Sequence, residues 1–433
     1  MNQKKSMKTY AASVGLIALS ASVLSAVESS VLNSQQTTKP WSVSAALRGF
    51  YDDNINSSPS GSAQESWGVQ ISPSINYGFA GERTSVNFGY FLAANWYDRP
   101  YSTWSGPWQL TQTIQGALTH TFNPRINVNL QNSFVIGQEP DVLQMANTPL
   151  ATAQQISGDN IRNYAAATLN FQATSLLGFQ LGYGNTIFNY DDSGPGSNSA
   201  LLDRMENAVH LDSRWTLQPQ TIGILGYMYN NVNYTGDEVI GIRSLGPLTA
   251  DIMSDDRNSN GNTVYAGVEH AFTPDIAGKV NAGAQFYDFY NDPQADTQTT
   301  PYIQGSLTYA YRATSSVQIG LSLMQNPIST VDPQGLSYVL NAESLLVYAA
   351  WVHEIMPKLY GNLNGAFQQS KYNGGSVDGD SGFYYRVGVS LAYEFTKHFS
   401  ANVGYNWDQS DTPEAVNQSY DRNRVFFGVT ASY

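Results

Sequence analysis

The sequence predicts an all-β fold, a transmembrane up-and-down antiparallel β-barrel of about eighteen strands. Three observations predict it. Segments that alternate apolar and polar residues recur along the chain, short and long connections alternate between them, and the last segment ends on an aromatic residue. A segment of about ten alternating residues is what a tilted strand needs to cross a bilayer.

The composition favours such a barrel wall. Only 13% of the 433 residues are charged, and the chain contains 28 Tyr and 37 Gly. With a mean hydropathy of -0.30, the chain resembles neither a helical membrane protein nor a highly charged soluble one. A net charge of -13 argues against a nucleic-acid surface. Because the chain has no Cys, disulfides and thiolate metal sites are excluded.

The first residues read as a secretory signal peptide. Lys4, Lys5 and Lys8 precede an apolar run at residues 11–24, which the small residues Ser25 and Ala26 follow. We expect a signal peptide at residues 1–26, with cleavage after Ser25 or Ser22 as alternatives. A membrane anchor is disfavoured because the run is shorter than the roughly 20 residues of a spanning helix. Residues 27–40 then form a polar periplasmic leader, and residues 41–433 the barrel.

The clearest strand is expected at residues 399–407. One face carries Phe399, Ala401, Val403, Tyr405 and Trp407, and the other Ser400, Asn402, Gly404 and Asn406. Residues 317–323 and 126–131 alternate in the same way. A soluble β-sandwich would alternate as well, so the connections must decide.

Tight turns and long polar loops strictly alternate. The turns are rich in Pro, Gly or charge, at residues 81–83, 123–125, 218–220, 273–275, 312–314, 356–358 and 396–398. The acidic residues, Asp52 and Asp53 among them, fall mostly in the long loops. This is the pattern of a membrane barrel with periplasmic turns and extracellular loops. With both termini periplasmic, the number of strands must be even.

The last ten residues resemble the closing strand of a bacterial outer-membrane β-barrel. Val425, Phe427, Val429, Ala431 and Tyr433 share one face. We expect Phe427, Val429 and Tyr433 to act as an assembly signal. The partners implied are the barrel assembly machinery, outer-membrane lipids and lipopolysaccharide.

Two short motifs, Gly49-Phe-Tyr-Asp-Asp-Asn54 and Gln138-Glu-Pro-Asp141, resemble the putative beta-barrel porin type 2 family. The resemblance implies an outer-membrane location and a pore, and some related barrels are encoded with exopolysaccharide export systems. It implies no catalytic residue and no cofactor. The Tyr51-Asp52-Asp53-Asn54 segment is equally consistent with ordinary hairpin chemistry.

An enzyme on a barrel wall would need a catalytic base, and histidine is the first residue type to examine for that role. His120, His270, His353 and His398 lie beside the tight turns, which is ordinary interfacial placement. His210 shares a strand face with Asp212 and Arg214, where a polar ladder in the lumen is favoured over catalysis. We therefore expect no enzymatic activity.

One segment has the opening of a calcium loop. Asp256, Asn258 and Asn260 alternate before Gly261, but the twelfth position, where a bidentate Glu belongs, is Gly267. The segment is therefore a weak calcium candidate, with a solvated polar loop as the alternative.

The inward faces are expected to carry nearly balanced charge, which must meet water or a partner. The expected cations are Arg48, Arg204, Arg214, Lys279, Arg386 and Arg424. The expected anions are Glu206, Asp212, Glu269, Glu394 and Asp408. Mixed signs predict weak ion selectivity; structural pairing without influence on transport is the alternative.

Aromatic residues share these inward faces, at Phe50, Phe91, Tyr97, Tyr164, Tyr265, Tyr287, Tyr302, Tyr348 and Tyr384. A track of aromatic faces could guide sugars by stacking. The alternative is that these rings fill space and brace the loops.

The predicted function is a porin-like channel for passive diffusion of small hydrophilic solutes and ions. The alternative is a plugged or partner-dependent barrel that serves exopolysaccharide export or envelope structure. By resemblance to the third loop of general porins, residues 138–162 are the first candidate for a constriction, with charges at Glu139, Asp141 and Asp159. Residues 235–262 are the competing candidate.

Overall fold

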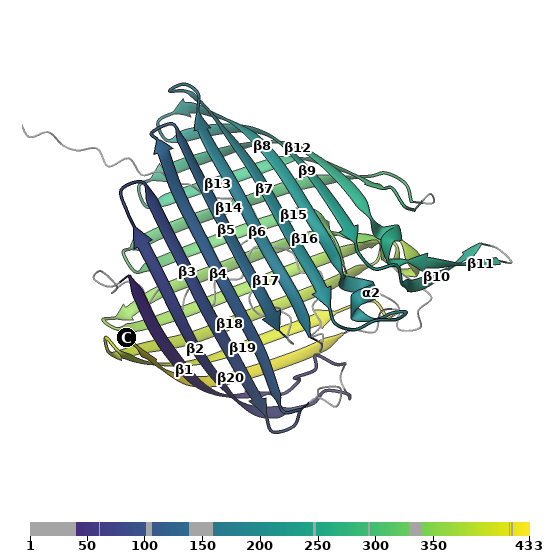
Figure 1. Ribbon diagram of the computed structural model, residues 1–433, viewed down its shortest axis with the longest axis horizontal. Helices are drawn as coiled ribbons and strands as arrows, with labels where there is room; N and C mark the ends of the chain where they lie inside the picture. Colours follow the sequence, from purple (N-terminus) through teal and green to yellow (C-terminus); the bar gives the residue numbers. More distant parts are fainter. Residues whose placement is uncertain are drawn as a thin grey trace, which may run out of the picture.

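The computed structural model describes residues 40–59, 61–100, 106–137, 159–245, 248–292, 295–328, 339–414, 416 and 419–433, apart from the side chains of residues 243–245, 248 and 376. They form a closed antiparallel sheet of 18 strands (Figure 1). The strands are β1 (Trp41–Asp52), β2 (Ser66–Ala80), β3 (Thr84–Tyr97), β4 (Trp108–Asn123), β5 (Ile126–Gly137), β6 (Asn160–Gln172), β7 (Leu177–Tyr190), β8 (Arg204–Gln218), β9 (Thr221–Tyr234), β12 (Ser259–Thr273), β13 (Ile276–Phe289), β14 (Gln298–Arg312), β15 (Ser315–Asn326), β16 (Asn341–Met356), β17 (Leu359–Asn373), β18 (Ser381–Thr396), β19 (Phe399–Asp411) and β20 (Tyr420–Ser432).

The first and last strands close the barrel. Strand β1 pairs with β2 on one side and with β20 on the other, so that Leu47 lies opposite both Ile71 and Val429. The backbones of Val43 and Tyr433 exchange two hydrogen bonds beside this seam. Closure leaves no strand edge unpaired, which is what a sheet in hydrocarbon requires. The predicted fold class and strand number are confirmed.

Tight turns gather at one end of the barrel and long connections at the other. Strand β2 ends at Ala80 and β3 begins at Thr84, whereas β7 and β8 are separated by residues 191–203. Threonine hydroxyls shape several turns: Thr396 Oγ1, for example, accepts hydrogen bonds from the backbone N–H groups of His398 and Phe399. The C-terminus lies at the tight-turn end, on the left of Figure 1.

Alternation along each strand sorts apolar residues to the outside. In β20, Val425, Phe427 and Val429 are exposed, whereas Arg422, Arg424 and Phe426 at the alternate positions are buried. Strand β1 shows the same pattern, with Val43 and Leu47 outward and Phe50 inward. The sheet thus turns an apolar face outward and a polar face to the lumen. Among the described residues, helices are too short and too polar to cross a membrane.

The long connections fold into structure of their own. They contain α2 (Asn198–Leu202), the hairpin of β10 (Val239–Leu245) and β11 (Leu248–Met253), and the 3₁₀ turns η1 (Ser254–Arg257) and η2 (Gly375–Val377). Side chains from α2, the hairpin, β13 and the segment before β16 form one apolar cluster: Ala200, Ile240, Ile252, Phe289 and Leu340. We call these elements the cap.

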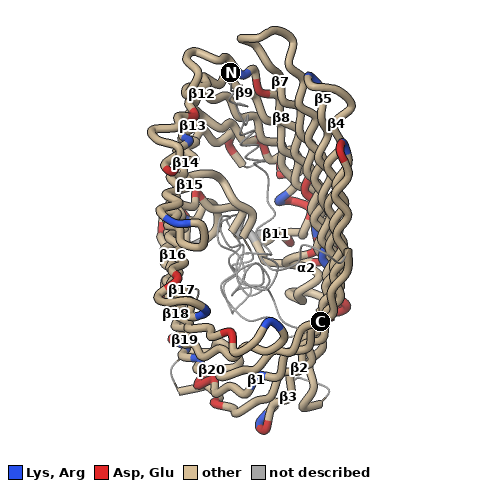
Figure 2. Tube along the Cα trace, turned by 90° about the vertical axis from the view of Figure 1, so that its left-hand side faces the viewer, with Lys and Arg blue, Asp and Glu red and all other residues tan. Residues whose placement is uncertain are grey.

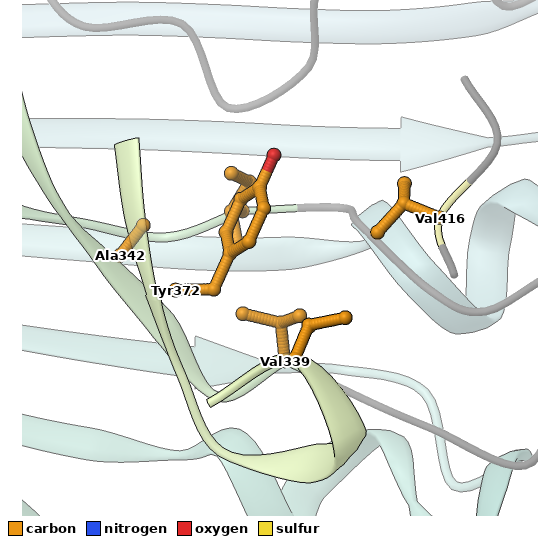
Figure 3. Packing of buried hydrophobic residues seen from close by; sticks show 6 residues of the cluster. Val339, Ala342, Tyr372 and Val416 are labelled. Atoms are coloured by element: carbon orange, nitrogen blue, oxygen red, sulfur yellow. The ribbon is translucent and has the colours of Figure 1, made fainter. Parts of the chain in front are cut away.

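A second apolar cluster joins three further connections. Tyr372 at the end of β17 packs with Val339, Ala342 and Val416, as Figure 3 shows, and with Ile328 and Val377. Residues far apart in sequence therefore meet at the long-loop end. Because their apolar side chains are buried there, these loops are packed against one another.

Candidate functional site

The candidate site is the inward face of the barrel, seen along the barrel in Figure 2 as an elongated ring of strands. The structure places each predicted lumen residue on this face, and it distributes the charged ones other than Glu394 over three groups. Two groups lie on β8, β12 and β13, and the third on β1 and β18–β20. Their pairing decides what electric field a solute meets.

Arg204 and Glu206 form the first group, at the long-loop end of β8. Arg204 Nε lies 2.7 Å from Glu206 Oε1, and its Nη1 donates to the backbone oxygen of Leu202 at 3.0 Å. The guanidinium also stacks 4.0 Å from the ring centroid of Phe188. This arginine is held on three sides, so it anchors the end of the strand.

The second group is a triad around Glu269 on β12. Its carboxylate accepts two hydrogen bonds from Arg214 of β8, at 3.1 and 2.5 Å, and lies 3.0 Å from Lys279 Nζ of β13. Two cations and one anion therefore meet across three strands. Buried charges that are paired and hydrogen-bonded in this way hold each other in fixed positions.

His210 and Asp212 lie beside this triad but do not form a catalytic pair. The Asp212 carboxylate accepts a hydrogen bond from Tyr265, two strands away. The His210 ring lies over Gly182 of β7, and its Nδ1 makes no hydrogen bond to a protein atom. A general base needs a group that orients it, and here Asp212 is bonded elsewhere.

The third group links β1, β18, β19 and β20. Arg422 bonds Asp52 with Nε and Nη2, the shortest distance being 2.6 Å, and Asp408 lies opposite both Arg422 and Arg386 in the strand register. These four charged residues and the neighbouring Tyr420 of β20 are all buried. Burial and bidentate geometry make the Arg422–Asp52 pair a rigid clamp across the seam.

Arg48 and Arg424 continue the third group toward the centre of the barrel. Arg424 lies 4.2 Å from the ring centroid of Phe50, and Arg48 lies 4.6 Å from that of Phe426. Arg48 also donates to Gln70 at 3.2 Å. Cations and rings thus alternate up β1 and β20, and each of these guanidinium groups lies against the face of a ring.

Three charged residues of this wall were missed by the sequence analysis. Arg162, Arg422 and Asp52 are buried inward residues at the long-loop ends of β6, β20 and β1. The prediction that Asp52 belongs to a loop is wrong, because β1 runs to that residue and turns its carboxylate to Arg422. The same two-residue alternation, continued to the strand ends, would have found all three.

Several of the inward aromatic residues lie across glycines of the neighbouring strand. A Cβ on Gly226 would come within 2.2 Å of Tyr265, one on Gly68 within 2.1 Å of Phe50, and one on Gly320 within 2.3 Å of Tyr348. Such rings cover the glycine and fill the wall, as in aromatic rescue of β-sheet glycines. Phe50, Tyr97, Tyr265, Tyr287, Tyr302 and Tyr384 are buried, which favours the space-filling interpretation over a sugar track.

The calcium candidate does not form a loop that gathers its three residues. Asp256 lies in η1 and accepts from the backbone of Met253, whereas Asn258 accepts from the backbone of Tyr234. Asn260 belongs to β12, where its oxygen accepts from Tyr229 and Asn231. The three residues are therefore not gathered into one loop, because strand β12 begins inside the segment. Among the described residues no cluster of His, Asp and Glu is arranged to hold a metal ion.

The remaining predicted residues lie at the two ends. Glu139 and Asp141 of the predicted constriction loop lie outside the described residues, whereas Asp159 precedes β6. Glu394 is a buried inward residue two positions before the tight-turn end of β18. His120 and His270 lie at the same end and bond Thr84 and Thr221, each at 2.8 Å. Phe427 and Tyr433 are exposed by 60% and 66%.

Comparison with solved structures finds chains that align with most of this one. OpdK from Pseudomonas aeruginosa aligns over 91% of this chain and 99% of its own at 10% identity, with a TM-score of 0.43. OccAB4 from Acinetobacter baumannii aligns over 92% and 100% at 12% identity, with a TM-score of 0.45. OccK2 (OpdF) from Pseudomonas aeruginosa, solved with glucuronate, aligns over 90% of this chain and 98% of its own at 11% identity, with a TM-score of 0.44.

Among curated proteins none matches the sequence. The family model described as "Putative beta-barrel porin 2" matches residues 42–433. That range begins one residue after the start of β1 and includes every strand that follows. The closed barrel, its apolar exterior and its charged interior agree with the description of this family model. The chain therefore belongs to this family of outer-membrane beta-barrel porins.

Proposed function

We propose that the protein is an outer-membrane channel for passive diffusion of small hydrophilic solutes and ions. The observation that carries this proposal is the closed wall of 18 strands whose inward face bears paired charges. Barrels of sixteen to eighteen strands are too wide for wall side chains to fill and leave an aqueous channel. Paired charges on such a wall need water beside them.

The pairing also sets the selectivity. Arg204 is bound to Glu206, Arg214 and Lys279 to Glu269, and Arg422 to Asp52. A paired charge contributes less field to the lumen than an isolated one, since the opposite sign lies within about 3 Å. The channel should therefore pass both cations and anions, with geometry deciding most of its preference.

Single-channel conductance of the purified, folded protein in a planar bilayer tests the proposal. We expect discrete, ohmic steps that scale with salt concentration. A heat-unfolded sample is the control for contamination by other porins. Folded protein that inserts and gives no steps would overturn the proposal of an open channel.

The competing function is a plugged barrel that serves export or envelope structure, and the packed cap is the observation that favours it. Arg257 of η1 is buried and donates to the backbone oxygens of Ala200, Leu201 and Ile328. Loops tied together in this way could narrow the mouth. Absent conductance in full-length protein, restored when residues 237–256 are replaced by a short turn, would support this function.

We further propose that the tight-turn end and both termini face the periplasm, and that the protein acts without catalysis. Short periplasmic turns and long extracellular loops are the rule for such barrels. Because the chain lacks Cys, Asp191→Cys in a long loop and Asp275→Cys in a tight turn can be labelled separately. On intact cells an impermeant maleimide should label the Asp191→Cys variant and not the Asp275→Cys variant. Labelling of only the Asp275→Cys variant would show that the tight turns face outward.

The expected partners in assembly are the barrel assembly machinery and lipopolysaccharide, and the exposed terminal residues Phe427 and Tyr433 support this. Of the predicted constriction loop at residues 138–162, the last three residues belong to β6. The part before β6 stays the first candidate for a constriction, with Glu139, Asp141 and Asp159 as its charges. Shortening residues 147–158 should raise the conductance, and an unchanged conductance would remove this loop from the pore.

A further inference from the structure

A row of amide and small side chains crosses the outward face of β4–β8. In the strand register Gly116 lies opposite Asn132, Asn132 opposite Ala165, Ala165 opposite Asn185, and Asn185 opposite Asn207. We call these five residues the amide row. Residues that follow one another across paired strands on one face are spatial neighbours, so the row is a continuous strip.

The amide row lies inside the apolar band, below its outer edge. On β5, Asn132 has Leu130 on its periplasmic side and Ile136 on its outer side, exposed by 43% and 41%. On β7, Asn185 lies between Leu181 and Ile187, exposed by 46% and 36%. A residue with lipid-facing apolar side chains both above and below it on its strand is in hydrocarbon, not in the headgroup region.

Contacts within the barrel satisfy these amides only in part. Asn132 Nδ2 donates to Asn163 Oδ1 at 2.9 Å, and Asn185 Nδ2 to Asn207 Oδ1 at 3.0 Å. Among the described residues no hydrogen bond uses Asn132 Oδ1, Asn163 Nδ2 or Asn207 Nδ2. An amide oxygen accepts two bonds and its nitrogen donates two. Lipid tails offer neither, and each unmet group costs free energy there.

The chemistry of the strip selects its partner. The outward residues of β4–β8 include no Lys, Arg, Asp or Glu, so a lipid phosphate finds no cation and a basic segment no anion. The strip offers neutral donors and neutral acceptors together. A surface that carries both is complementary to a copy of itself, which is what a two-fold interface requires.

The shape of the strip fits the same partner. A Cβ on Gly116 would meet no atom within 4 Å, so packing inside the barrel does not demand glycine there, unlike at Gly226. Gly116 and Ala165 leave a shallow, side-chain-poor surface of the kind that lets membrane proteins approach closely. Strands β4 and β5 lie on a long side of the elongated barrel (Figure 2) and at the front of Figure 1.

The middle parts of β18 and β20 lack this character. The outward residues Val387, Val389 and Leu391 of β18 are apolar and exposed, as are Val425 and Phe427 of β20. These faces suit lipid. Beyond Asn207 the register continues with outward amides at Asn231 of β9 and Asn260 of β12, but these bond each other and Tyr229, so the unmet groups described above lie on β5, β6 and β8.

We propose that the amide row, together with Asn163, is the contact surface of a two-fold symmetric dimer of this chain in the outer membrane. Amides of one copy supply the donors and acceptors that the other leaves unmet. Because lipid is as apolar as leucine, replacing amides by leucine removes the attraction without creating a new one.

Mass photometry of protein extracted directly into lipid nanodiscs tests the proposal. We expect the wild type at twice the monomer mass, and Asn132→Leu/Asn185→Leu at the monomer mass, with a dimer fraction at least tenfold lower. Val389→Leu on β18 is the matched control and should stay dimeric. Heat-modifiable gel mobility establishes that each variant is folded.

Single cysteines give an independent readout because the natural chain has none. In native membranes a short bis-maleimide should link Gly116→Cys or Ala165→Cys to a second copy, and should leave Val389→Cys unlinked. A monomeric wild type, with or without bound lipopolysaccharide, would overturn the proposal. So would a dimer that survives both leucine substitutions.

Discussion

At the scale of single residues, the inward wall depends on pairs of one large ring and one glycine. Tyr265 crosses Gly226 to reach Asp212, and His210 lies over Gly182. The glycine is needed because the ring occupies the volume that a Cβ would take. Ring and glycine lie directly opposite each other in the register, so each pair fixes the alignment of two strands.

Gly226→Ala should destabilise the barrel by about 1–3 kcal/mol, the usual cost of overpacking. Its new methyl group would lie 2.2 Å from the Tyr265 ring and 2.5 Å from Asp212 Oδ1. Gly49→Ala is the control, since a Cβ there meets nothing within 4 Å. Urea titration of folded protein in micelles measures both, and equal stabilities would contradict the close packing of Tyr265.

Charge on the two faces of β19 should have unequal effects. Val403 is 44% exposed on the outward face, and Asn402 points inward. Val403→Arg should cost on the order of 2–4 kcal/mol near the midplane, whereas Asn402→Arg faces the lumen and should be mild. Folding titrations in lipid vesicles compare them. Equal costs would show that the two faces are not distinguished by lipid.

At the scale of elements, the seam and the cap are held together by different interactions. The seam between β1 and β20 is a regular ladder reinforced by the buried Arg422–Asp52 pair. The cap is irregular backbone held by apolar clusters and by Arg257. Burial lowers the pKa of the Arg257 guanidinium, and the ring of Tyr234, 3.8 Å from its Cζ, offsets part of that cost.

Deleting residues 427–433 should prevent assembly in the outer membrane. The deletion removes six of the nine residue pairs between β20 and β1 and five of the twelve between β20 and β19. It leaves backbone groups unpaired in hydrocarbon, at several kcal/mol each. Heat-modifiable protein in outer-membrane fractions is the measure. Normal amounts of folded truncated protein would contradict an assembly role for Phe427, Val429 and Tyr433.

Arg257→Met should loosen the cap and spare the barrel. It removes charged hydrogen bonds to three backbone oxygens, each worth about 1.5–3 kcal/mol, while methionine keeps apolar bulk. Amide hydrogen exchange should speed up in α2 and stay unchanged in β18–β20. Unchanged protection of α2 would mean that the apolar cluster alone holds the cap.

At the scale of the whole molecule, charge is separated by location. The net charge of -13 contrasts with a wall in which four cations are bound to carboxylates, namely Arg204, Arg214, Lys279 and Arg422. Exposed acidic residues such as Asp191 and Asp237 lie in the long connections. The mouth should therefore attract cations at low salt, and the interior should discriminate little.

Reversal potentials in a salt gradient should accordingly show at most weak cation preference, which fades as salt rises. The Debye length falls to roughly 3 Å at 1 M, so that the acidic loops lose their influence. Neutralising loop acids, for example Asp191→Asn/Asp237→Asn, should reduce the preference at low salt. Strong anion selectivity would contradict this account of the lumen.

The sequence by itself determined the architecture, because a strand in a membrane barrel must alternate at every residue. That local rule placed Arg48, Arg214 and Asp408 on the inward face and Val403 and Phe427 outside, without knowledge of any neighbour. The tight turns determined the connectivity as well, because each of them joins two consecutive strands.

Only the tertiary structure decided which residues meet. Glu269 bonds Arg214, 55 positions away, and Arg422 bonds Asp52 across 370. Such partners depend on register and closure, which alternation leaves open. The cap depends on where strands end, and so does the separation of Asp256 from Asn260. A strand end is set by packing against other loops rather than by the residues of the strand itself. The amide row appears only when five strands are aligned.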